Sequence, residues 1–314
     1  MNQKKVLISI CIPAYKRVDQ LRRLLQSISI QSFKDFEVVI SDDSPDNSVQ
    51  NLVNEFSHLK INYIRNNIAL GTPANWNYAI SRAKGEWIKI MHDDDWFSAA
   101  GSLTVFAEHS RTGKSFVFSA YTDVFESGRI SNPQFTGTWK NRIIRNPVTL
   151  LAKNVIGPPS VTMIHSSIRE EYDTFLKWRV DIDLYIRLLK TLKEYSFIET
   201  RLVNVGISST QVTNDCINVP GVELPEGLIL LNKYGTSPLK HILVYDAWWR
   251  ILRNTGIRSI AQIQDYTPYN SWPRAIIQMI KHQAYIPAFF LRMGVFSKLF
   301  MLISYFFNRR NLQS

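Results

Sequence analysis

Three consecutive carboxylates follow an apolar run in the first third of the chain. Residues 87–96 are WIKIMHDDDW, so Asp93, Asp94 and Asp95 come directly after a segment with the length of a buried strand. Three adjacent like charges repel one another and need a neutralising partner. A hard divalent cation, Mg2+ or Mn2+, could supply it together with a phosphorylated ligand, because these cations prefer oxygen ligands. A solvated acidic turn is the alternative that this segment alone leaves open.

A second candidate binding segment is PAYKR, residues 13–17, which also follows an apolar run. Tyr15 could stack on a nucleotide base, and Lys16 and Arg17 could contact phosphates. An ordinary surface loop is the alternative. The glycine-rich patterns GxGxxG and GxxxxGKS/T are absent from the sequence. Phosphates would therefore be held by a metal ion and by side chains, which favours a metal-binding role for the three aspartates.

Two further aspartates are candidates for the same chemistry. Asp43 follows the apolar run 36–41, where nucleotide-binding α/β folds place an acid that accepts hydrogen bonds from a ribose or a base. A simple turn aspartate is the alternative. Asp181 lies near a predicted helix start, where the helix dipole favours a carboxylate. Asp181 and Asp183 do not share a helix face, so different roles are expected for them. A helix cap and a general base are both open for Asp181.

The elements that must position these residues alternate between strands and helices. Strands are predicted at 6–13, 36–41, 61–64 and 87–91, and helices at 18–31, from 49 to 56 and at 74–83. This alternation predicts a parallel sheet with helices on both faces, which places Asp43 and the three aspartates at the same carboxyl edge. After about residue 98 the alternation loosens. Strands are expected at 116–121 and 161–165, a polar irregular stretch at 128–139, and a helix at 181–192.

Composition allows a packed core in a chain of 314 residues, with 45% hydrophobic and 20% charged residues. Cys11 and Cys216 form no framework pattern, which fits a reducing cytoplasm. The six histidines show no zinc-ligand spacing. The net charge is +11, and the residues from 216 onward hold 11 Lys/Arg against 4 Asp/Glu. A basic balance suits nucleic acid, anionic lipid or phosphorylated substrates.

The last thirty residues combine apolar and basic side chains. Residues 299–307 are almost wholly apolar, with cations at Arg292, Lys298, Arg309 and Arg310. This pattern is typical of an interfacial helix on an anionic leaflet. A packed helical subdomain and a dimer contact are the alternatives. A run of eighteen uncharged apolar residues and a signal-peptide core are both absent from the sequence, so neither a spanning helix nor a leader is expected.

Taken in order, five motifs resemble the family 2 glycosyltransferases, which have the GT-A fold. The motifs are IPAYKR, DDSPD, the series Asn67, Gly71, Asn75, then AKGEWI with the three aspartates, and VDIDLYIR, within about residues 5–190. The resemblance implies a Rossmann-like mixed sheet flanked by helices, with a C-terminal helical extension. The composition becomes aromatic and basic from about residue 216, which predicts a catalytic domain at 1–215 and a basic, aromatic helical extension at 216–314 as a membrane-surface or acceptor region. Two departures are His92, at the first aspartate of the DxD element, and Val180, at the glutamate before the base.

The resemblance also implies roles for individual residues. Tyr15 would stack on the base, Asp43 would read it, and Asp181 would be the general base. The implied nucleotide-sugar-binding residues are Pro13, Tyr15, Arg17, Asp43, Asn75 and Asp93, and the implied metal ligands are Asp94, the direct one, and Asp95.

The implied activity is inverting transfer of a sugar, for example rhamnose or a hexose, from a UDP-, dTDP- or GDP-linked donor. The acceptor would be a hydroxyl of a polyprenyl-diphosphate-linked glycan in O-antigen or capsule biosynthesis. The cofactor would be Mn2+ or Mg2+, and the enzyme would be cytoplasmic and peripheral on the inner membrane face, with no nucleic acid partner.

Two other classes of protein compete with this interpretation. A sugar-nucleotide pyrophosphorylase would need a glycine-rich loop after the first strand, and residues 13–17 contain no glycine. A non-catalytic basic module that binds nucleic acid or membrane needs no triple carboxylate, which would repel a phosphate backbone.

Overall fold

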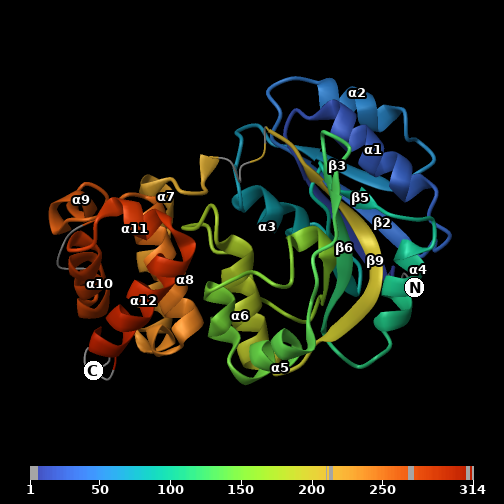
Figure 1. The fold of residues 1–314 in the computed structure, drawn as a ribbon. Coiled ribbons are helices and arrows are strands. Elements are labelled where there is room, and N and C mark those ends of the chain that lie inside the picture. Colours follow the sequence, from blue (N-terminus) through green and yellow to red (C-terminus); the bar gives the residue numbers. More distant parts are fainter. Residues whose placement is uncertain (1–5, 210, 212–214, 268–271, 309–311, 313–314) are drawn as a thin grey trace. The chain divides into compact units, whose positions relative to one another are not determined.

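The computed structural model describes residues 6–209, 211, 215–267, 272–308 and 312. It contains a nine-stranded mixed sheet in the order β3-β2-β1-β4-β8-β6-β9-β5, with β7 paired to β6 (Figure 1). The strands are β1 (Ile8–Ala14), β2 (Phe36–Asp42), β3 (Ile61–Arg65), β4 (Trp87–Ile90), β5 (Trp96–Phe97), β6 (Phe116–Phe125), β7 (Ile130–Ser131), β8 (Thr162–His165) and β9 (Ser196–Ile207).

The chain divides into two compact units that do not follow chain order. Unit 1 comprises Met1–Ile144, Val155–Thr174 and Asp183–Ser209, and unit 2 comprises Arg145–Asn154, Phe175–Ile182 and Thr210–Ser314. The division therefore differs from a single boundary after residue 215, because two short internal segments group with the C-terminal residues.

The first half of unit 1 is the predicted parallel arrangement. Strands β3, β2, β1 and β4 run parallel, so β1, β2 and β4 all end at one edge of the sheet. Side chains alternate between the two faces along β1, as the period of a strand requires. Ile8, Ile10 and Ile12 join the main core cluster, whereas Cys11 packs with Val39 and Ala79 on the other face.

Helices cover both faces of this sheet. The helices of unit 1 are α1 (Val18–Ser29), α2 (Ser48–Asn54), α3 (Ala74–Ser81), α4 (Ser102–His109) and α5 (Gly137–Arg145), and α6 (Val180–Leu192) begins in unit 2 and continues in unit 1. Helix α1 is amphipathic and buries Leu21, Leu24, Leu25 and Ile28 in the main core. Helix α3 lies on the opposite face, where Ala79 meets Cys11 and Val39.

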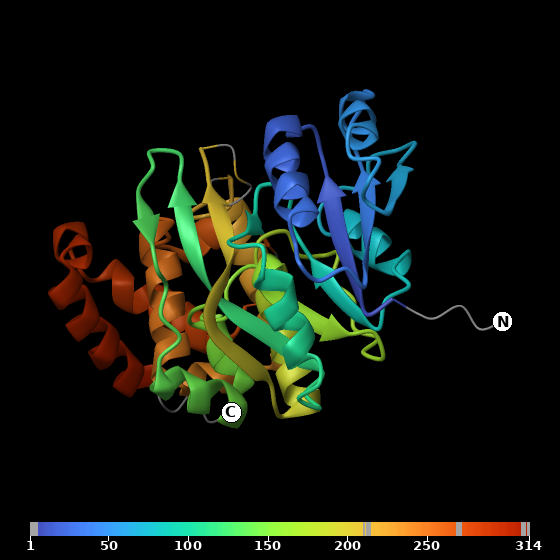
Figure 2. The same cartoon turned by 90° about the vertical axis from the view of Figure 1, so that its right-hand side faces the viewer.

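The second half of the sheet is where the sequence prediction was incomplete. The long strand β9 was missed, although it pairs parallel with β6 over most of its length (Figure 2). The pairing is interrupted by register shifts near Ala120, and charged residues such as Glu199 and Arg201 break the apolar alternation of β9. The stretch 128–139, expected to be irregular, contains β7 and the start of α5.

From Pro220 onward, the described residues of unit 2 are mostly helical. Its helices are α7 (Pro220–Tyr234), α8 (Ile242–Asn254), α9 (Ile260–Gln264), α10 (Arg274–Ala284), α11 (Ala288–Arg292) and α12 (Gly294–Asn308). Its buried aromatic side chains include Tyr245, Trp248 and Trp249 of α8, which form part of the interior of this unit. Within the described residues, none of the helices combines the length and the apolar character that a membrane crossing requires.

Candidate active site

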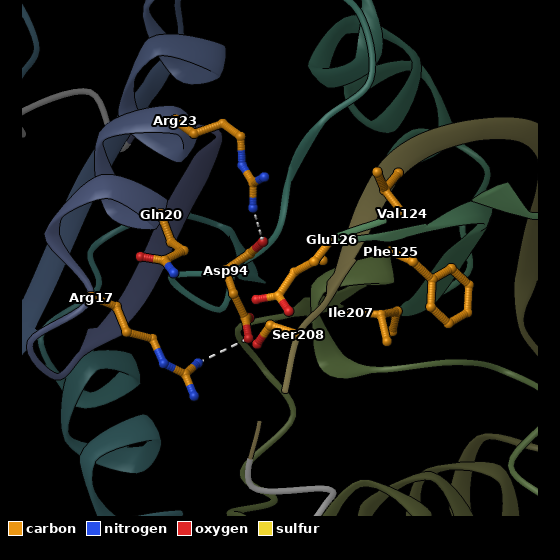
Figure 3. A pocket seen from close by; sticks show the side chains of 10 residues that line it. Arg17, Gln20, Arg23, Asp94, Val124, Phe125, Glu126, Ile207 and Ser208 are labelled. Atoms are coloured by element: carbon orange, nitrogen blue, oxygen red, sulfur yellow. Dashed lines mark hydrogen bonds and ion pairs between the residues drawn. The ribbon is translucent and has the colours of Figure 1, made fainter. Parts of the chain in front are cut away.

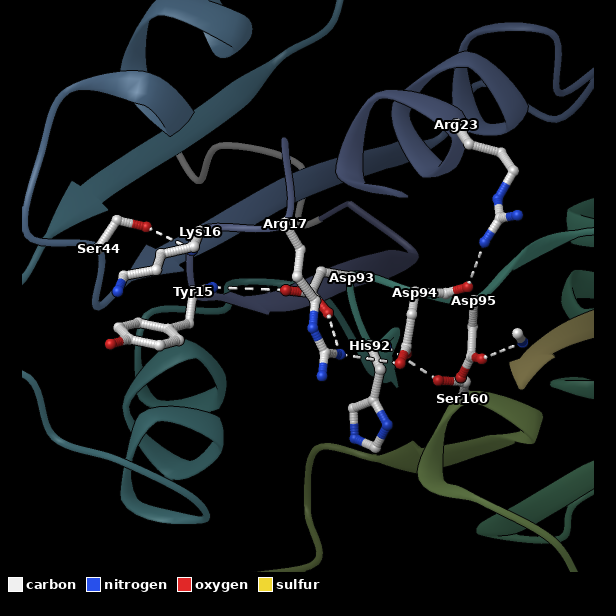
Figure 4. Close-up of polar contacts among 11 residues, drawn as sticks. Tyr15, Lys16, Arg17, Arg23, Ser44, His92, Asp93, Asp94, Asp95 and Ser160 are labelled. Carbon is white, nitrogen blue, oxygen red and sulfur yellow. Dashed lines mark hydrogen bonds and ion pairs between the residues drawn. The ribbon is translucent and has the colours of Figure 1, made fainter. Parts of the chain in front are cut away.

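The three consecutive aspartates lie in a turn directly after β4, and all three are buried (Figure 4). Arg17 pairs with two of them, at 2.9 Å from its Nη1 to Asp94 Oδ2 and at 3.4 Å to Asp93 Oδ1. The Tyr15 amide N–H also points to Asp93, at 3.4 Å. The loop after β1 and the turn after β4 therefore meet, as the shared carboxyl edge predicted.

Burial of these like charges shifts the proton affinity of their carboxyl groups. Desolvation, and then the charge of Asp94, raise the pKa of Asp93 and the pKa of Asp95 well above the ordinary range. The neighbouring His92 shifts in the opposite direction, because burial lowers its pKa to about 4. His92 is therefore a neutral imidazole near pH 7, which is the form that can ligate a metal ion.

The residues present fit a divalent cation. His92, Asp94 and Asp95 each offer one ligand atom, and these three atoms lie within 4.8 Å of one another. The buried Nε2 atom of His92 has no hydrogen-bond partner among the described residues. A cation bound by this nitrogen and the two carboxylates would give the buried nitrogen the partner that it lacks. His92 was noted in the sequence only as a departure from the family pattern, and its position makes it a third candidate ligand.

Side chains that the sequence did not single out hold the acidic turn from behind. Buried Lys89 donates from Nζ to the carbonyl of Ser160, and the Ser160 hydroxyl accepts the His92 amide N–H at 2.9 Å. Ser160 also hydrogen-bonds the Asp95 side chain. Burial lowers the pKa of Lys89 to about 7. The turn Pro159–Val161, labelled η2, therefore couples β4 to the acidic turn through one serine.

Strand β9 approaches the acidic turn at a glycine. The Gly206 amide N–H donates to Asp95 Oδ1 at 3.0 Å. A Cβ atom on Gly206 would lie only 2.4 Å from the Asp94 carbonyl oxygen, so any side chain there would push the strand away. Next to Gly206, Arg23 donates from Nη2 to the same carbonyl at 2.7 Å, and its guanidinium carbon lies 3.6 Å from the Trp96 ring centroid.

A cavity of about 110 Å3 lies beside Asp94 (Figure 3). Arg17, Arg23 and Asp94 line one side of it, and Glu126 and Ser208, just beyond the ends of β6 and β9, line the other. It has room for several water molecules or a small polar group. Charged side chains therefore share the lining with the apolar side chains of Val124, Phe125 and Ile207.

The loop after β1 presents Tyr15 to solvent. Its side chain is 51% exposed, with the Lys16 ammonium 5.0 Å from the ring centroid. Lys16 adopts a left-handed backbone conformation, with φ of 66°, and its amide N–H donates to Ser44 Oγ at 2.7 Å. Pro13 is buried in β1, beyond the point where pairing with β4 stops at Cys11. Pro13 still pairs in register with Ser41 of β2, and a residue without an amide N–H is tolerated because pairing on the β4 side has already ended.

Asp43 and Asn75 are buried and already hold the neighbouring loop. Asp43 Oδ1 accepts from the Asn66 side chain and the Leu70 amide, and Oδ2 accepts from the Gly71 amide at 2.8 Å. Asn75 bonds Ser41 through both ends of its amide group. Asn75 is thus placed to support Asp43 and its loop, and a direct contact with a nucleotide stays a prediction for both residues.

Asp181 belongs to unit 2 and is described within it. Its Oδ1 accepts the Ile182 amide N–H at 2.7 Å, and its Oδ2 accepts from Asn154 Nδ2 at 2.7 Å. Desolvation raises its pKa to about 7. The preceding segment is held by Glu226 of α7, whose carboxylate accepts the amide N–H groups of Lys177, Trp178 and Arg179. The carboxylate of Asp181 thus has a fixed orientation and a proton affinity suited to exchange near neutral pH.

Asp183 has different surroundings from Asp181, and the prediction that the two residues have different roles stays a prediction. Its side chain is buried and pairs with Arg187 at 2.9 Å, one turn along α6. This is a structural ion pair within unit 1.

Comparison with known sequences decides the family. The sequence model described as "Glycosyl transferase family 2" matches residues 9–172, which is more than half of the chain. The chain belongs to glycosyl transferase family 2. The matched range includes Tyr15, Asp43 and the acidic turn, and it ends before Asp181.

Two relatives illustrate the range of similarity. The chain is 26% identical over 212 residues to "Putative colanic acid biosynthesis glycosyl transferase WcaA" of Escherichia coli K12, covering 66% of this chain and 76% of the relative. It is 30% identical over 115 residues to the GalNAc(5)-diNAcBac-PP-undecaprenol beta-1,3-glucosyltransferase of Campylobacter jejuni, covering 35% of this chain and 37% of the relative. The chain is therefore a glycosyltransferase, and the prediction of an enzyme of this class is confirmed.

Solved structures agree on the fold. S. aureus TarS 1-349 in complex with UDP-GlcNAc superposes with a TM-score of 0.60 at 15% identity, covering 90% of this chain and 93% of that chain. The mannosyltransferase PcManGT from Pyrobaculum calidifontis, in complex with GDP-Man and Mn2+, gives a TM-score of 0.50 at 13% identity, covering 98% of this chain and 87% of that chain. The predicted GT-A fold, a mixed sheet flanked by helices, is confirmed.

Proposed function

We propose that this family 2 enzyme transfers a sugar from a nucleotide-diphosphate donor to a hydroxyl of a lipid-linked glycan, with inversion at the anomeric carbon, in the synthesis of a bacterial surface polysaccharide. The observation that carries the proposal is the buried group of His92, Asp94 and Asp95 at the carboxyl end of β4, next to Tyr15 and Arg17. A diphosphate with its cation matches this group in charge and in ligand chemistry.

The donor nucleotide is held at the ends of β1 and β2. The half-exposed ring of Tyr15 stacks on the base, and the loop that Asp43 organises forms the other wall. Asp43 Oδ2 accepts a hydrogen bond from the Gly71 amide, and a carboxylate oxygen has two lone pairs, so it can also accept one from the base. Arg17, at the start of α1, contacts the diphosphate as its counter-charge.

Asp94, Asp95 and His92 would hold Mn2+ or Mg2+, with Asp94 as the direct ligand of the donor-bound ion. When bound, such an ion supplies charge stabilisation to the phosphate oxygens of the leaving nucleotide. Lys89, Ser160 and Gly206 fix the acidic turn, so that its carboxylates do not have to reorganise as charge develops.

Asp181 takes the proton from the acceptor hydroxyl. A pKa of about 7 leaves a substantial fraction of the carboxylate ionised at neutral pH while keeping it basic enough to accept the proton. One such base suffices for direct in-line attack, because an inverting transfer forms no glycosyl-enzyme. Asn154 keeps the carboxylate oriented.

The acceptor class rests on the relatives and on the charge of the chain. The Campylobacter relative is named for a glycan on undecaprenyl diphosphate. The C-terminal excess of Lys and Arg suits a diphosphate-linked, membrane-borne acceptor presented at the inner membrane surface. The enzyme would then work on the cytoplasmic side as a peripheral protein.

A thermal-shift screen of the purified protein against UDP-, dTDP- and GDP-sugars, each with Mn2+, tests the donor part. A donor present at 100 times its dissociation constant adds about 2.7 kcal/mol of stability. We expect one nucleotide class to raise the melting temperature only when Mn2+ is present, and Tyr15→Ala to abolish the rise. Ile30→Ala, an exposed apolar position outside the site, is the matched control. If no nucleotide sugar shifts the melting temperature, the proposal is wrong.

A further inference from the structure

The two C-terminal helices α11 and α12 expose a continuous set of large apolar side chains. We call this set the α11–α12 apolar surface, defined by Phe289, Val295, Leu299, Ile303, Phe306 and Phe307. Val295 is 84% exposed and Phe307 is 76% exposed. Scattered exposed apolar residues are normal on a protein, whereas a contiguous set marks an interaction site.

The polarity of α12 is reversed relative to a helix that faces water. Three of its four buried residues are polar, namely Ser297, Ser304 and Asn308. Ser304 Oγ lies 2.7 Å from the Tyr245 hydroxyl and 2.7 Å from His282 Nδ1. The inward face is therefore satisfied by hydrogen bonds, and the apolar face is left outside. A water-facing helix normally shows the opposite distribution.

The charge around this surface is of one sign. Residues 266–314 contain six Lys/Arg and no Asp or Glu. Of these, Lys281, Arg292 and Lys298 are exposed on α10, α11 and α12. A second copy of the chain would bring the same cations face to face, which costs energy. An anionic surface with an apolar interior would satisfy both the cations and the phenylalanines.

We propose that the α11–α12 apolar surface inserts into the headgroup and acyl boundary of an anionic phospholipid leaflet, with Arg292 and Lys298 at the phosphates. The 15 residues of α12 reach about 22 Å, which is shorter than the roughly 30 Å hydrocarbon core. The helix thus lies in the interface and does not cross it. Membrane binding would bring the enzyme to a lipid-linked acceptor. Only this purpose rests on the proposed function, because the binding itself is argued from the surface of α11 and α12.

Vesicle flotation of the full-length protein without donor or metal tests this directly. Vesicles of phosphatidylcholine alone are compared with vesicles of equal parts phosphatidylglycerol and phosphatidylcholine, at low and at high salt. We expect flotation with the anionic vesicles and a strong loss of it at high salt, because surface charge attraction is screened. Equal flotation with both compositions, or none with either, overturns the proposal.

Matched variants separate the apolar from the electrostatic contribution. Val295→Gln with Leu299→Gln and Phe306→Gln should abolish flotation, whereas Ile30→Gln with Ile130→Gln, equally exposed apolar positions in unit 1, should not. Arg292→Gln with Lys298→Gln should weaken binding about 30-fold, from roughly fivefold for each cation. Lys34→Gln with Lys60→Gln removes the same charge elsewhere and should leave binding unchanged.

A labelling experiment keeps the test valid if a multiple variant fails to fold. Both native cysteines are buried, so a thiol-reactive, environment-sensitive dye can report on one introduced cysteine. Phe306→Cys should show a blue shift with anionic vesicles, and Ile30→Cys should not. No shift at Phe306, or a concentration-dependent dimer that the triple variant dissolves, overturns the proposal in favour of a protein partner. Donor binding in the thermal-shift screen is independent of these results, so failure of the membrane inference and failure of the proposed function are distinguishable.

Discussion

Two regions of this protein depart from the usual distribution of polar and apolar side chains, and they do so in opposite ways. The turn after β4 buries Asp93, Asp94 and Asp95, although carboxylates normally face water. Helix α12 exposes Val295 and Phe307, although such side chains are normally inside. Each departure costs stability unless a ligand or surface compensates it.

Contacts within the protein hold each of these two regions in place without a ligand or a membrane. The acidic turn is neutralised by cations of the same chain, with Arg17 on Asp93 and Asp94 and Lys89 behind Ser160. Helix α12 is anchored through the hydrogen bonds of its inward polar face. In the acidic turn, cationic side chains compensate the buried carboxylates. In α12, hydrogen bonds of the polar face hold the helix so that its apolar face is exposed.

The largest loss of turnover is expected for Asp181→Asn. Asp181 is a partly buried carboxylate that lies outside the acidic turn. The variant keeps the shape and removes the basicity, so turnover should fall by about 10² to 10⁴ while donor affinity stays unchanged. Steady-state kinetics with a matched Asp183→Asn variant check this, since Asp183 serves an ion pair with Arg187. Normal turnover in Asp181→Asn would show that the base lies elsewhere.

The raised pKa of Asp181 also gives a pH dependence with a definite sign. Turnover should rise with pH up to about 7 and then level off, because the base works when it is ionised. The folded state holds this proton more tightly than the unfolded chain, so ionisation between about pH 4 and 7 costs folding stability. The melting temperature of Asp181→Asn should therefore rise relative to that of the wild type as the pH increases through this window. A difference that stays constant with pH would contradict the raised pKa of Asp181.

The next largest effect is expected when the proposed metal site is removed, which tests whether the buried carboxylates bind a cation that turnover requires. Asp94→Ala, or an excess of EDTA with the wild type, should lower turnover about 100- to 1000-fold, the equivalent of several kcal/mol of lost charge stabilisation. The free energy of unfolding of Asp94→Ala should hardly fall, because one repelling charge has been removed and Arg17 keeps Asp93. Asp46→Ala, an exposed turn aspartate, is the control. Full turnover in EDTA would refute the metal assignment.

A smaller effect on stability should separate the two faces of α12. Ser304→Ala removes a partner from the Tyr245 hydroxyl and from His282, so it should destabilise the protein by about 1–3 kcal/mol. Leu299→Gln, on the exposed face of the same helix, should change stability by less than about 0.5 kcal/mol in water. Chemical unfolding measures both. If Leu299→Gln proves the more damaging change, the apolar face is covered within the protein and the comparison fails.

The smallest effect concerns Arg17 as the counter-charge of the donor-free site. Arg17→Gln should strengthen the binding of Mn2+ alone about fivefold, since a partly exposed ion pair contributes up to about 1 kcal/mol. The same change should weaken donor binding. Calorimetric titration with Mn2+ measures the change, and Arg22→Gln is the matched control, because Arg22 pairs with Glu55 on the outside of α1. Unchanged affinity for Mn2+ would mean that Arg17 does not compete with the ion.

The sequence predicted the parts of the site that are local in the chain. Asp93, Asp94 and Asp95 are adjacent, and the strands that bring Tyr15 to them have clear apolar runs, so both the acidic turn and its neighbours could be placed in advance. Ser160 and Gly206 could not be placed in advance. Gly206 lies in β9, the strand that the prediction missed, and Ser160 lies in the short turn η2, so no apolar run placed either residue beside the acidic turn.

Other outcomes depended on contacts that only a structure provides. Asn75 belongs to a family motif, yet its amide is engaged inside the protein with Ser41. The run 299–307 predicted an apolar helix. Because this helix has apolar residues on every side, the sequence alone does not show which face is buried. That information came from the hydrogen bonds of Ser297 and Ser304.

Those hydrogen bonds set the rotation of α12 about its own axis. A helix that is apolar nearly all around could turn by one residue, about 100°, and still bury a similar hydrophobic area. Ser297, Ser304 and Asn308 are spaced seven and four residues apart, so they form one stripe, and Trp249, Tyr245 and Ala275 offer them partners only in one setting. The buried polar contacts thus fix the orientation of the helix, and Met301 is the one apolar residue among the four that α12 buries.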